Sequence, residues 1–140
     1  MKKRHTIIAT HGLLAKGLAS ALNIIVGELE DTTVICGYTT PEFDLAATID
    51  TTMASIDVST SEVVVFTDLL GGSINNGFIT ALSKYHFHLF TNTNLAVLMD
   101  YYITHPDLDE FTQKLSGDDF KPMDCNALVA TMQNDLEDDL

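Results

Sequence analysis

Proline, cysteine and basic residues are all scarce in this sequence, and each shortage excludes a class of protein. Three prolines among 140 residues, with 46% hydrophobic content, predict one compact domain over residues 1–140. Cys36 and Cys125 lie far apart without C-x-x-C spacing, so we expect reduced thiols and neither a disulfide framework nor a zinc site. No stretch rich in proline and alanine marks a linker.

The shortage of basic residues disfavours nucleic acid as a partner. Seven lysines and arginines against 20 acidic residues give a net charge of -13, whereas binding to a phosphate backbone requires a basic surface. The acidic residues gather at 107–110, at 118–119 and in the C-terminal tail 134–140, which we interpret as solvated surface. A protein partner is expected to be basic where it touches this chain.

Long hydrophobic runs are also missing. The longest, Val63–Phe66 and Leu95–Met99, are far shorter than the roughly 20 residues of a membrane helix. The basic start, Met1–Arg4, is followed by an apolar stretch that is too short for a signal peptide. We therefore expect a cytoplasmic protein.

What the sequence does contain is an alternation of two hydrophobic periods. Continuous apolar runs predict strands buried on both faces, and apolar residues spaced by three or four predict helices between them. Thr40-Pro41-Glu42 is interpreted as the start of the second helix. The order predicts an α/β fold with an open, doubly wound, mostly parallel sheet in strand order 2-1-3-4. The strands are expected at 5–9, 33–36, 62–66 and 87–90, and the helices at 14–29, 43–56, 74–85 and 95–103.

Beyond about residue 105 the pattern weakens. Residues 108–115 are expected to form a helix that ends at Gly117, and residues 126–135 a second helix. Between them, Phe120–Cys125 is expected as a short edge strand broken by Pro122, the candidate antiparallel addition to the sheet.

Two chemically capable residues fall at the ends of predicted strands. His11 follows the first strand and Asp68 the third. In a sheet ordered 2-1-3-4, ligands bind beyond the carboxyl ends of these two strands, so we expect the two residues to be neighbours. A carboxylate that accepts one imidazole N–H fixes the tautomer and leaves the other ring nitrogen free and more basic. By itself, a histidine at a strand end is more often a hydrogen-bonded structural residue than a catalyst.

Gly71, Gly72 and Ser73 follow Asp68 and form a second feature at the same edge. Paired glycines permit positive φ and expose backbone N–H groups, and Ser73 is expected to cap the next helix. Such a helix start is an anion site, although a tight turn explains the same residues. The loop is neither a Walker loop nor a G-x-G-x-x-G dinucleotide loop. A phosphoryl group on His11 would account for the histidine, the carboxylate and the glycines together.

Two stretches resemble the signatures of a known family. "ATHGLLAKGL" around His11 and "FTDLLGGSINN" around Asp68 are similar to those of the enzyme IIA domains of the mannose-type bacterial sugar phosphotransferase system (PTS). "TNTNLAVLMD", residues 91–100, is similar to the segment after the fourth strand in that family. The resemblance covers roughly residues 5–105. Ile74 stands where proline is common in the family.

The resemblance implies a function. His11 would accept a phosphoryl group from the phosphocarrier protein HPr and pass it to an enzyme IIB, which phosphorylates sugar entering through a membrane permease. Asp68 matches the family's hydrogen-bonded carboxylate, and Gly71, Gly72 and Ser73 match its phosphate-binding turn. No metal, nucleotide or other cofactor is implied. Family members form homodimers by exchanging an edge strand, for which 120–125 is the candidate here. Without a linker, IIB is expected to be a separate chain.

Two other functions remain open from the residues alone. A response-regulator receiver domain also carries an aspartate after its third strand, which Asp68 would match. Such a domain needs an acidic pair after the first strand to hold magnesium, where this chain has Thr10-His11. The other alternative is a non-catalytic regulatory module that binds phosphate without covalent chemistry. The four remaining histidines, His5, His86, His88 and His105, have no acidic or cysteine cluster at ligand spacing, so structural roles are expected.

Overall fold

The computed structural model describes the backbone of residues 2–138 and the side chains of residues 2–136. The chain divides into two compact units, Met1–His105 and Pro106–Leu140. The first unit contains the whole sheet and four helices, and the second contains two helices. The expectation of one functional domain over 1–140 stays a prediction.

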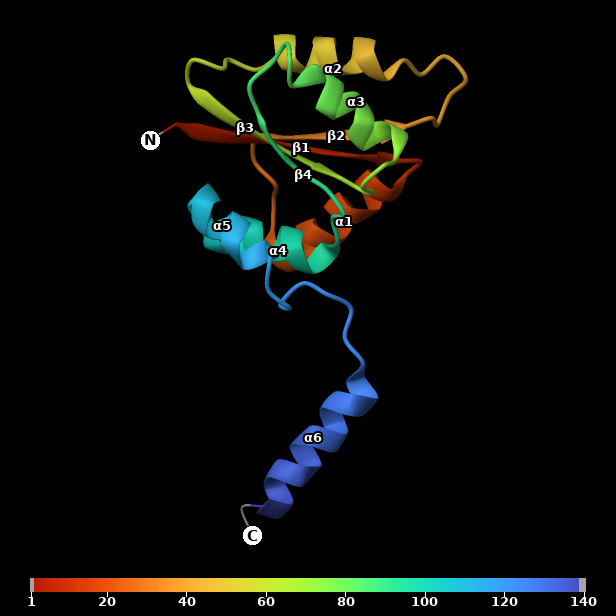
Figure 1. The fold of residues 1–140 in the computed structure, drawn as a ribbon. Helices are drawn as coiled ribbons and strands as arrows, with labels where there is room; N and C mark the ends of the chain where they lie inside the picture. The colour runs from red at the N-terminus through yellow and green to blue at the C-terminus, as the bar shows by residue number, and fades with distance from the viewer. Residues whose placement is uncertain (1, 139–140) are drawn as a thin grey trace. The chain divides into compact units, whose positions relative to one another are not determined.

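The first unit is an α/β fold in which strands and helices alternate. All strand pairs are parallel, and the sheet has the order β2-β1-β3-β4, so the predicted fold class and strand order are confirmed. Helices α2 and α3 cover one face of the sheet and α1 and α4 cover the other (Figure 1). The elements are β1 Lys3–His11, α1 Leu14–Val26, β2 Thr32–Gly37, α2 Leu45–Ala54, β3 Ser61–Thr67, α3 Ser73–Ala81, β4 His88–Phe90 and α4 Leu95–Thr104.

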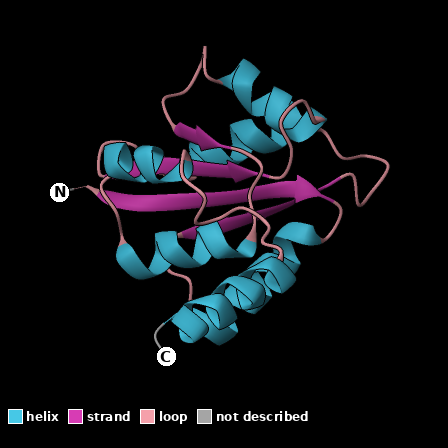
Figure 2. Ribbon diagram, turned by 60° about the horizontal axis from the view of Figure 1, so that its bottom comes forward, coloured by secondary structure: helices cyan, strands magenta, loops and turns pink. Residues whose placement is uncertain are grey.

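The register brings the carboxyl ends of the central strands to one edge. His11 of β1 is paired with Gly37 of β2, and Ala9 of β1 with Thr67 of β3. The side-by-side strands are visible in Figure 2. Because α1 follows β1 and α3 follows β3 on opposite faces of the sheet, the loops after these two adjacent strands flank the switch point where such sheets bind ligands.

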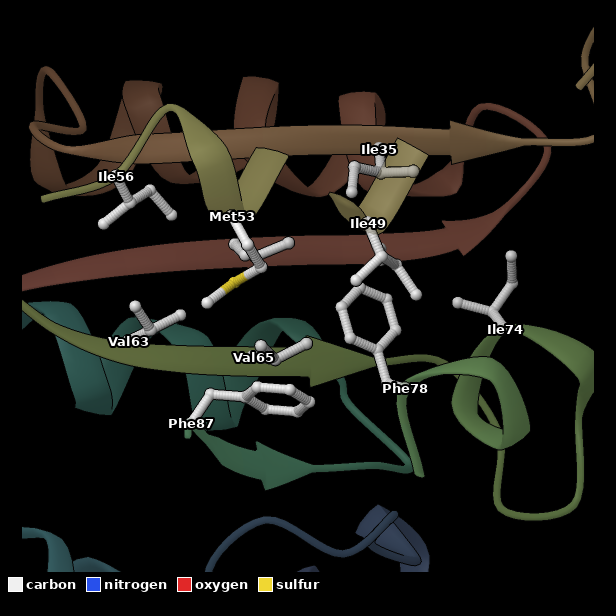
Figure 3. Packing of buried hydrophobic residues seen from close by; sticks show 11 residues of the cluster. Ile35, Ile49, Met53, Ile56, Val63, Val65, Ile74, Phe78 and Phe87 are labelled. Atoms are coloured by element: carbon white, nitrogen blue, oxygen red, sulfur yellow. The ribbon is translucent and has the colours of Figure 1, made fainter. Parts of the chain in front are cut away.

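Alternate strand residues fill two hydrophobic layers. Ile7 and Val65 belong to the layer between the sheet and helices α2 and α3 (Figure 3). Phe66 points to the other layer, where its ring meets Tyr101 of α4 edge-on at 4.9 Å between centroids. Because both faces are covered, the strands are apolar without polar alternation, which explains the continuous runs in the sequence.

Helix α2 starts later than the sequence predicts. Thr40-Pro41-Glu42 lies in a turn, closed by a hydrogen bond from the N–H of Phe43 to the carbonyl of Thr40. The N-cap is Asp44, whose carboxylate accepts the N–H of Ala47 at 3.0 Å. A charged acceptor satisfies a helix N–H and complements the helix dipole, which explains why the helix begins here.

The second unit contains α5, Leu108–Leu115, and α6, Cys125–Asp138. The predicted edge strand over 120–125 is wrong: these residues form turns and loop up to the start of α6. The N–H of Lys121 bonds the carbonyl of Asp118, and Asp124 accepts the N–H groups of Asn126 and Ala127. Pro122 has no N–H to offer a ladder, so the segment closes a turn and caps a helix instead.

Within residues 2–138, no helix is both long and apolar enough to cross a membrane.

Candidate active site

The turn after β1 places His11 at the edge of the sheet. Thr10 is fully buried, and its hydroxyl accepts the N–H of Ala15 at 2.7 Å, which ties the strand end to the first turn of α1. Gly12 adopts a positive φ of 57° and donates its N–H to the carbonyl of Gly37 at 2.8 Å. The chain therefore turns directly after His11, whose side chain is 43% exposed.

Asp68 contacts two nitrogen atoms of His11, one in the ring and one in the backbone. One carboxylate oxygen, Oδ2, lies 2.7 Å from His11 Nδ1 and accepts the backbone N–H of His11 at 2.9 Å. The other, Oδ1, accepts the N–H of Leu69 at 3.0 Å. The Asp68 side chain is only 9% exposed. The structure thus brings the two residues together, as the strand order predicts, while their catalytic role stays a prediction.

The electrostatics of the pair favour an ionised carboxylate. Burial raises the pKa of Asp68, but the backbone and side-chain hydrogen bonds from His11 and the charge of its ring outweigh this effect. The pKa of Asp68 therefore lies below its ordinary value. An ionised Asp68 accepts the Nδ1–H of a neutral imidazole, which leaves the lone pair on Nε2 available as a nucleophile.

The loop after Asp68 approaches the other side of the imidazole. Helix α3 begins at Ser73 with Gly72 as N-cap, so the expectation that Ser73 caps this helix is wrong. The Ser73 hydroxyl lies 3.2 Å from His11 Nε2 instead. Because the first N–H groups of a helix have no intrahelical acceptor, the start of α3 offers donors to an anion beside Nε2.

Both glycines of this loop are favoured by its geometry. Gly71 has a φ of 81°, a conformation that side chains with a Cβ rarely adopt. A Cβ on Gly72 would lie 3.3 Å from His11 Cε1 and 3.3 Å from the carbonyl oxygen of Leu69. With a Cβ at position 72, the imidazole or the loop would have to give by a few tenths of an ångström.

Two further residues at this edge are not identified by the sequence argument. Tyr38 follows β2, and its ring centroid lies 5.6 Å from that of His11. Asn92 follows β4, and its side-chain oxygen accepts the N–H of Leu70 at 2.9 Å. Both positions could have been found from the sequence, because the carboxyl ends of parallel strands meet at one edge, and Tyr38 comes directly after β2 and Asn92 two residues after β4.

Other histidines have partners that account for them. His5 Nε2 lies 2.7 Å from the Thr33 hydroxyl, and burial lowers the pKa of His5 although nearby Asp31 opposes this effect. His88 Nε2 lies 3.0 Å from a Glu62 oxygen. His105 ends α4 with a φ of 45°, and the His86 ring lies 5.9 Å from that of His88. Among the described residues, no three His, Cys, Asp or Glu side chains group as metal ligands.

The fold and the site define a doubly wound α/β domain with a carboxylate-held imidazole at its switch point. The chain belongs to the family described as PTS system fructose IIA component, whose model matches residues 5–116. This match ends about ten residues after the resemblance in the sequence, which covers roughly residues 5–105. No curated protein sequence gave a significant match.

Solved structures agree with this assignment. A protein from Klebsiella pneumoniae, described as a phosphoenolpyruvate-dependent sugar PTS permease, is 32% identical, with a TM-score of 0.81 over 91% of this chain and 95% of its own. The mannose/sorbose-specific IIA subunit of Enterococcus faecalis is 26% identical, with a TM-score of 0.66 over 81% and 87%. A PTS IIA protein associated with the fucose utilization operon of Streptococcus pneumoniae, 20% identical, shares the fold with a TM-score of 0.72 over 91% and 97%.

Proposed function

We propose that this chain is an enzyme IIA that accepts a phosphoryl group from phospho-HPr on His11 and passes it to an enzyme IIB during sugar uptake. The observation that carries the proposal is the 2.7 Å contact between His11 Nδ1 and Asp68, which leaves Nε2 of an exposed ring facing the start of α3. Membership of the PTS IIA family supports a phosphotransferase activity for this chain.

In the proposed reaction His11 acts as the nucleophile. The lone pair of Nε2 forms a bond to phosphorus while the bond between phosphorus and the HPr histidine breaks, and that electron pair returns to the HPr nitrogen. The proton on Nδ1 stays on His11, shared with Asp68, whose negative charge offsets the positive charge that the ring gains. The same steps in reverse deliver the phosphoryl group to IIB. Bonds and charges balance with phospho-HPr as the phosphoryl donor, so the proposed step needs no nucleotide.

Gly71, Gly72 and Ser73 would stabilise the transferred group. Phosphoryl transfer passes through a loose transition state with charge spread over three oxygens, so catalysis rests on positioning and on donors to those oxygens. The N–H groups at the start of α3 and the Ser73 hydroxyl, 3.2 Å from Nε2, are suited to this role.

The surface near His11 favours a protein as phosphoryl donor. Two leucines follow His11-Gly12 and two follow Asp68, and all four are at least half exposed: Leu13 65%, Leu14 50%, Leu69 57% and Leu70 70%. Exposed apolar side chains beside a site are typical of protein contacts and add nothing to the binding of free phosphate. The net charge of -13 favours a basic partner surface around this contact.

Phosphorylation by enzyme I and HPr with phosphoenolpyruvate tests the proposal. Wild-type protein should gain one phosphoryl group by mass spectrometry, acid-labile and alkali-stable, as expected for phosphohistidine. His11→Ala should gain none and remain folded, because its partly exposed side chain leaves no large cavity. His88→Ala is the matched control and should be phosphorylated like wild type.

Each alternative function predicts a different outcome. A His11→Ala protein that is still fully phosphorylated would end the proposal, and an acid-stable modification lost in alkali would point to Asp68 as the acceptor. Binding of phosphate without covalent labelling would support the regulatory module. The homodimer, the cytoplasmic location and the indirect link to a membrane permease stay predictions, which sedimentation and cell fractionation test.

A further inference from the structure

Tyr38 occupies an unusual position beside the site. It follows β2 immediately and has a φ of 63°, in the left-handed region. Its ring lies against the imidazole of His11 at 5.6 Å between centroids, with an angle of 32° between the planes. It also meets Phe43 edge-on at 5.1 Å between ring centroids. The side chain is 51% exposed.

The backbone conformation makes tyrosine a costly residue here. A left-handed φ is strained for a residue with a Cβ, whereas glycine adopts it freely. A half-exposed ring recovers only part of its possible burial energy, so burial is a weak reason for a tyrosine at this position. Glycine would lack the ring contacts with His11 and Phe43.

Hydrogen bonds alone leave the imidazole incompletely fixed. Asp68 holds Nδ1 and Ser73 lies beside Nε2, but both contacts act near the plane of the ring. Contacts at the ring edge permit the imidazole to tilt and to rotate about its side-chain bonds. The Tyr38 ring lies beside the imidazole with its plane inclined by 32°, and this ring contact is a restraint additional to the hydrogen bonds at the two nitrogens.

Phe43 connects this contact to the hydrophobic core. Phe43 packs against the core cluster that contains Ile74 and Phe78. Gly37 permits this approach, because a Cβ there would lie 3.3 Å from Phe43 Cε1 and 2.5 Å from Ile74 Cδ1. A side chain that rests on a packed core can hold a neighbour in place, whereas a free surface tyrosine cannot.

We propose that Tyr38 is a positioning residue, whose ring holds the imidazole of His11 with Nδ1 on Asp68 and Nε2 toward the incoming phosphoryl group. The inference rests on the proposed phosphotransfer function. Positioning raises the rate because transfer requires the attacking nitrogen to be in line with the breaking bond, and small misplacements are costly. The ring, and not the phenol hydroxyl, performs this role.

Three variants test the inference. Tyr38→Gly removes the ring and relieves the backbone, so the protein should remain folded while its rate of phosphorylation by phospho-HPr falls about tenfold. Tyr38→Phe keeps the ring and should stay within about twofold of wild type. Asp31→Gly is the matched control, since Asp31 also has a positive φ, 47°, but precedes β2 at the opposite edge of the sheet. Its rate should not change.

A second readout separates this inference from the function on which it rests. NMR of the ring nitrogens of His11 in unphosphorylated protein should show one tautomer in wild type, Tyr38→Phe and Asp31→Gly, and exchange between states in Tyr38→Gly. Wild-type ring signals in Tyr38→Gly would overturn the inference, whether or not His11 is phosphorylated. An equal loss of rate in Tyr38→Phe or Asp31→Gly would also overturn it. Absence of phosphorylation in wild type would overturn the function alone.

Discussion

The sheet carries a histidine–carboxylate pair at each of two opposite edges. His11 and Asp68 meet at 2.7 Å beyond the carboxyl ends of β1 and β3, and His88 and Glu62 meet at 3.0 Å near the amino ends of β4 and β3. The distances are similar but the surroundings differ. Asp68 is 9% exposed and accepts two backbone N–H groups, whereas Glu62 is 36% exposed and also faces Arg4 at 3.7 Å.

A histidine beside a carboxylate does not by itself make a candidate active site. At the carboxyl edge the carboxylate is fixed by the backbone, a helix begins beside the free ring nitrogen, and glycines permit close approach. The contact between His88 and Glu62 is partly exposed, and polar contacts of this kind contribute little energy. Position on the fold, more than residue type, distinguishes the two pairs.

Removing the carboxylate from each pair should give the largest difference between the two edges. Asp68→Asn keeps the shape but loses the charge that offsets the positive ring of phosphohistidine, so phosphorylation by phospho-HPr should slow by about 10- to 100-fold. Glu62→Gln is the matched change at the other edge and should leave the rate unaltered. Rapid-quench measurement of phosphoprotein formation gives both rates.

Equal rates for Asp68→Asn and wild type would show that the carboxylate is not part of the reaction. A slow Glu62→Gln protein with a normal melting temperature would show that the two edges are functionally linked.

Adding a methyl group beside His11 should have a smaller effect. Gly72→Ala places a Cβ about 3.3 Å from His11 Cε1, so the ring or the loop must shift, and we expect transfer to slow about tenfold. Gly17→Ala is the control, because a Cβ there meets nothing within 4 Å and α1 should gain about 0.5–1 kcal/mol of stability. Transfer rates and thermal melts measure the two effects. A Gly72→Ala protein as fast as wild type would mean that the close approach is unimportant.

The smallest expected effect is on stability in acid. The pKa of Asp68 is lowered in the folded protein, so its contribution to stability is complete above the unfolded-state pKa of about 4 and is lost as the pH falls through the lower folded value. Asp68→Asn should therefore lose less stability than wild type between pH 5 and pH 2, as urea unfolding at each pH would measure. Parallel curves would show that the Asp68 carboxylate has the same pKa in both states.

Much of the first unit follows from local patterns in the sequence. The strands are continuous apolar runs because both faces of the sheet are covered, and the alternation of strands and helices leads to the order β2-β1-β3-β4. That order places His11 beside Asp68, because the carboxyl ends of adjacent parallel strands share one edge. The sequence by itself therefore determined the fold class, the sheet order and the central pair of the candidate site.

Only the tertiary structure decided how the surrounding groups are used. Ser73 lies beside Nε2 of His11, and Gly72 is the N-cap of α3. Helix α2 is capped by Asp44 and does not start at Thr40. Residues 120–124 lie in turns and loop where a strand was expected. The contact of Tyr38 with His11 also belongs here. Caps, turns and ring contacts depend on differences of about 1 kcal/mol among competing partners, and the folded chain alone fixes which partners are within reach.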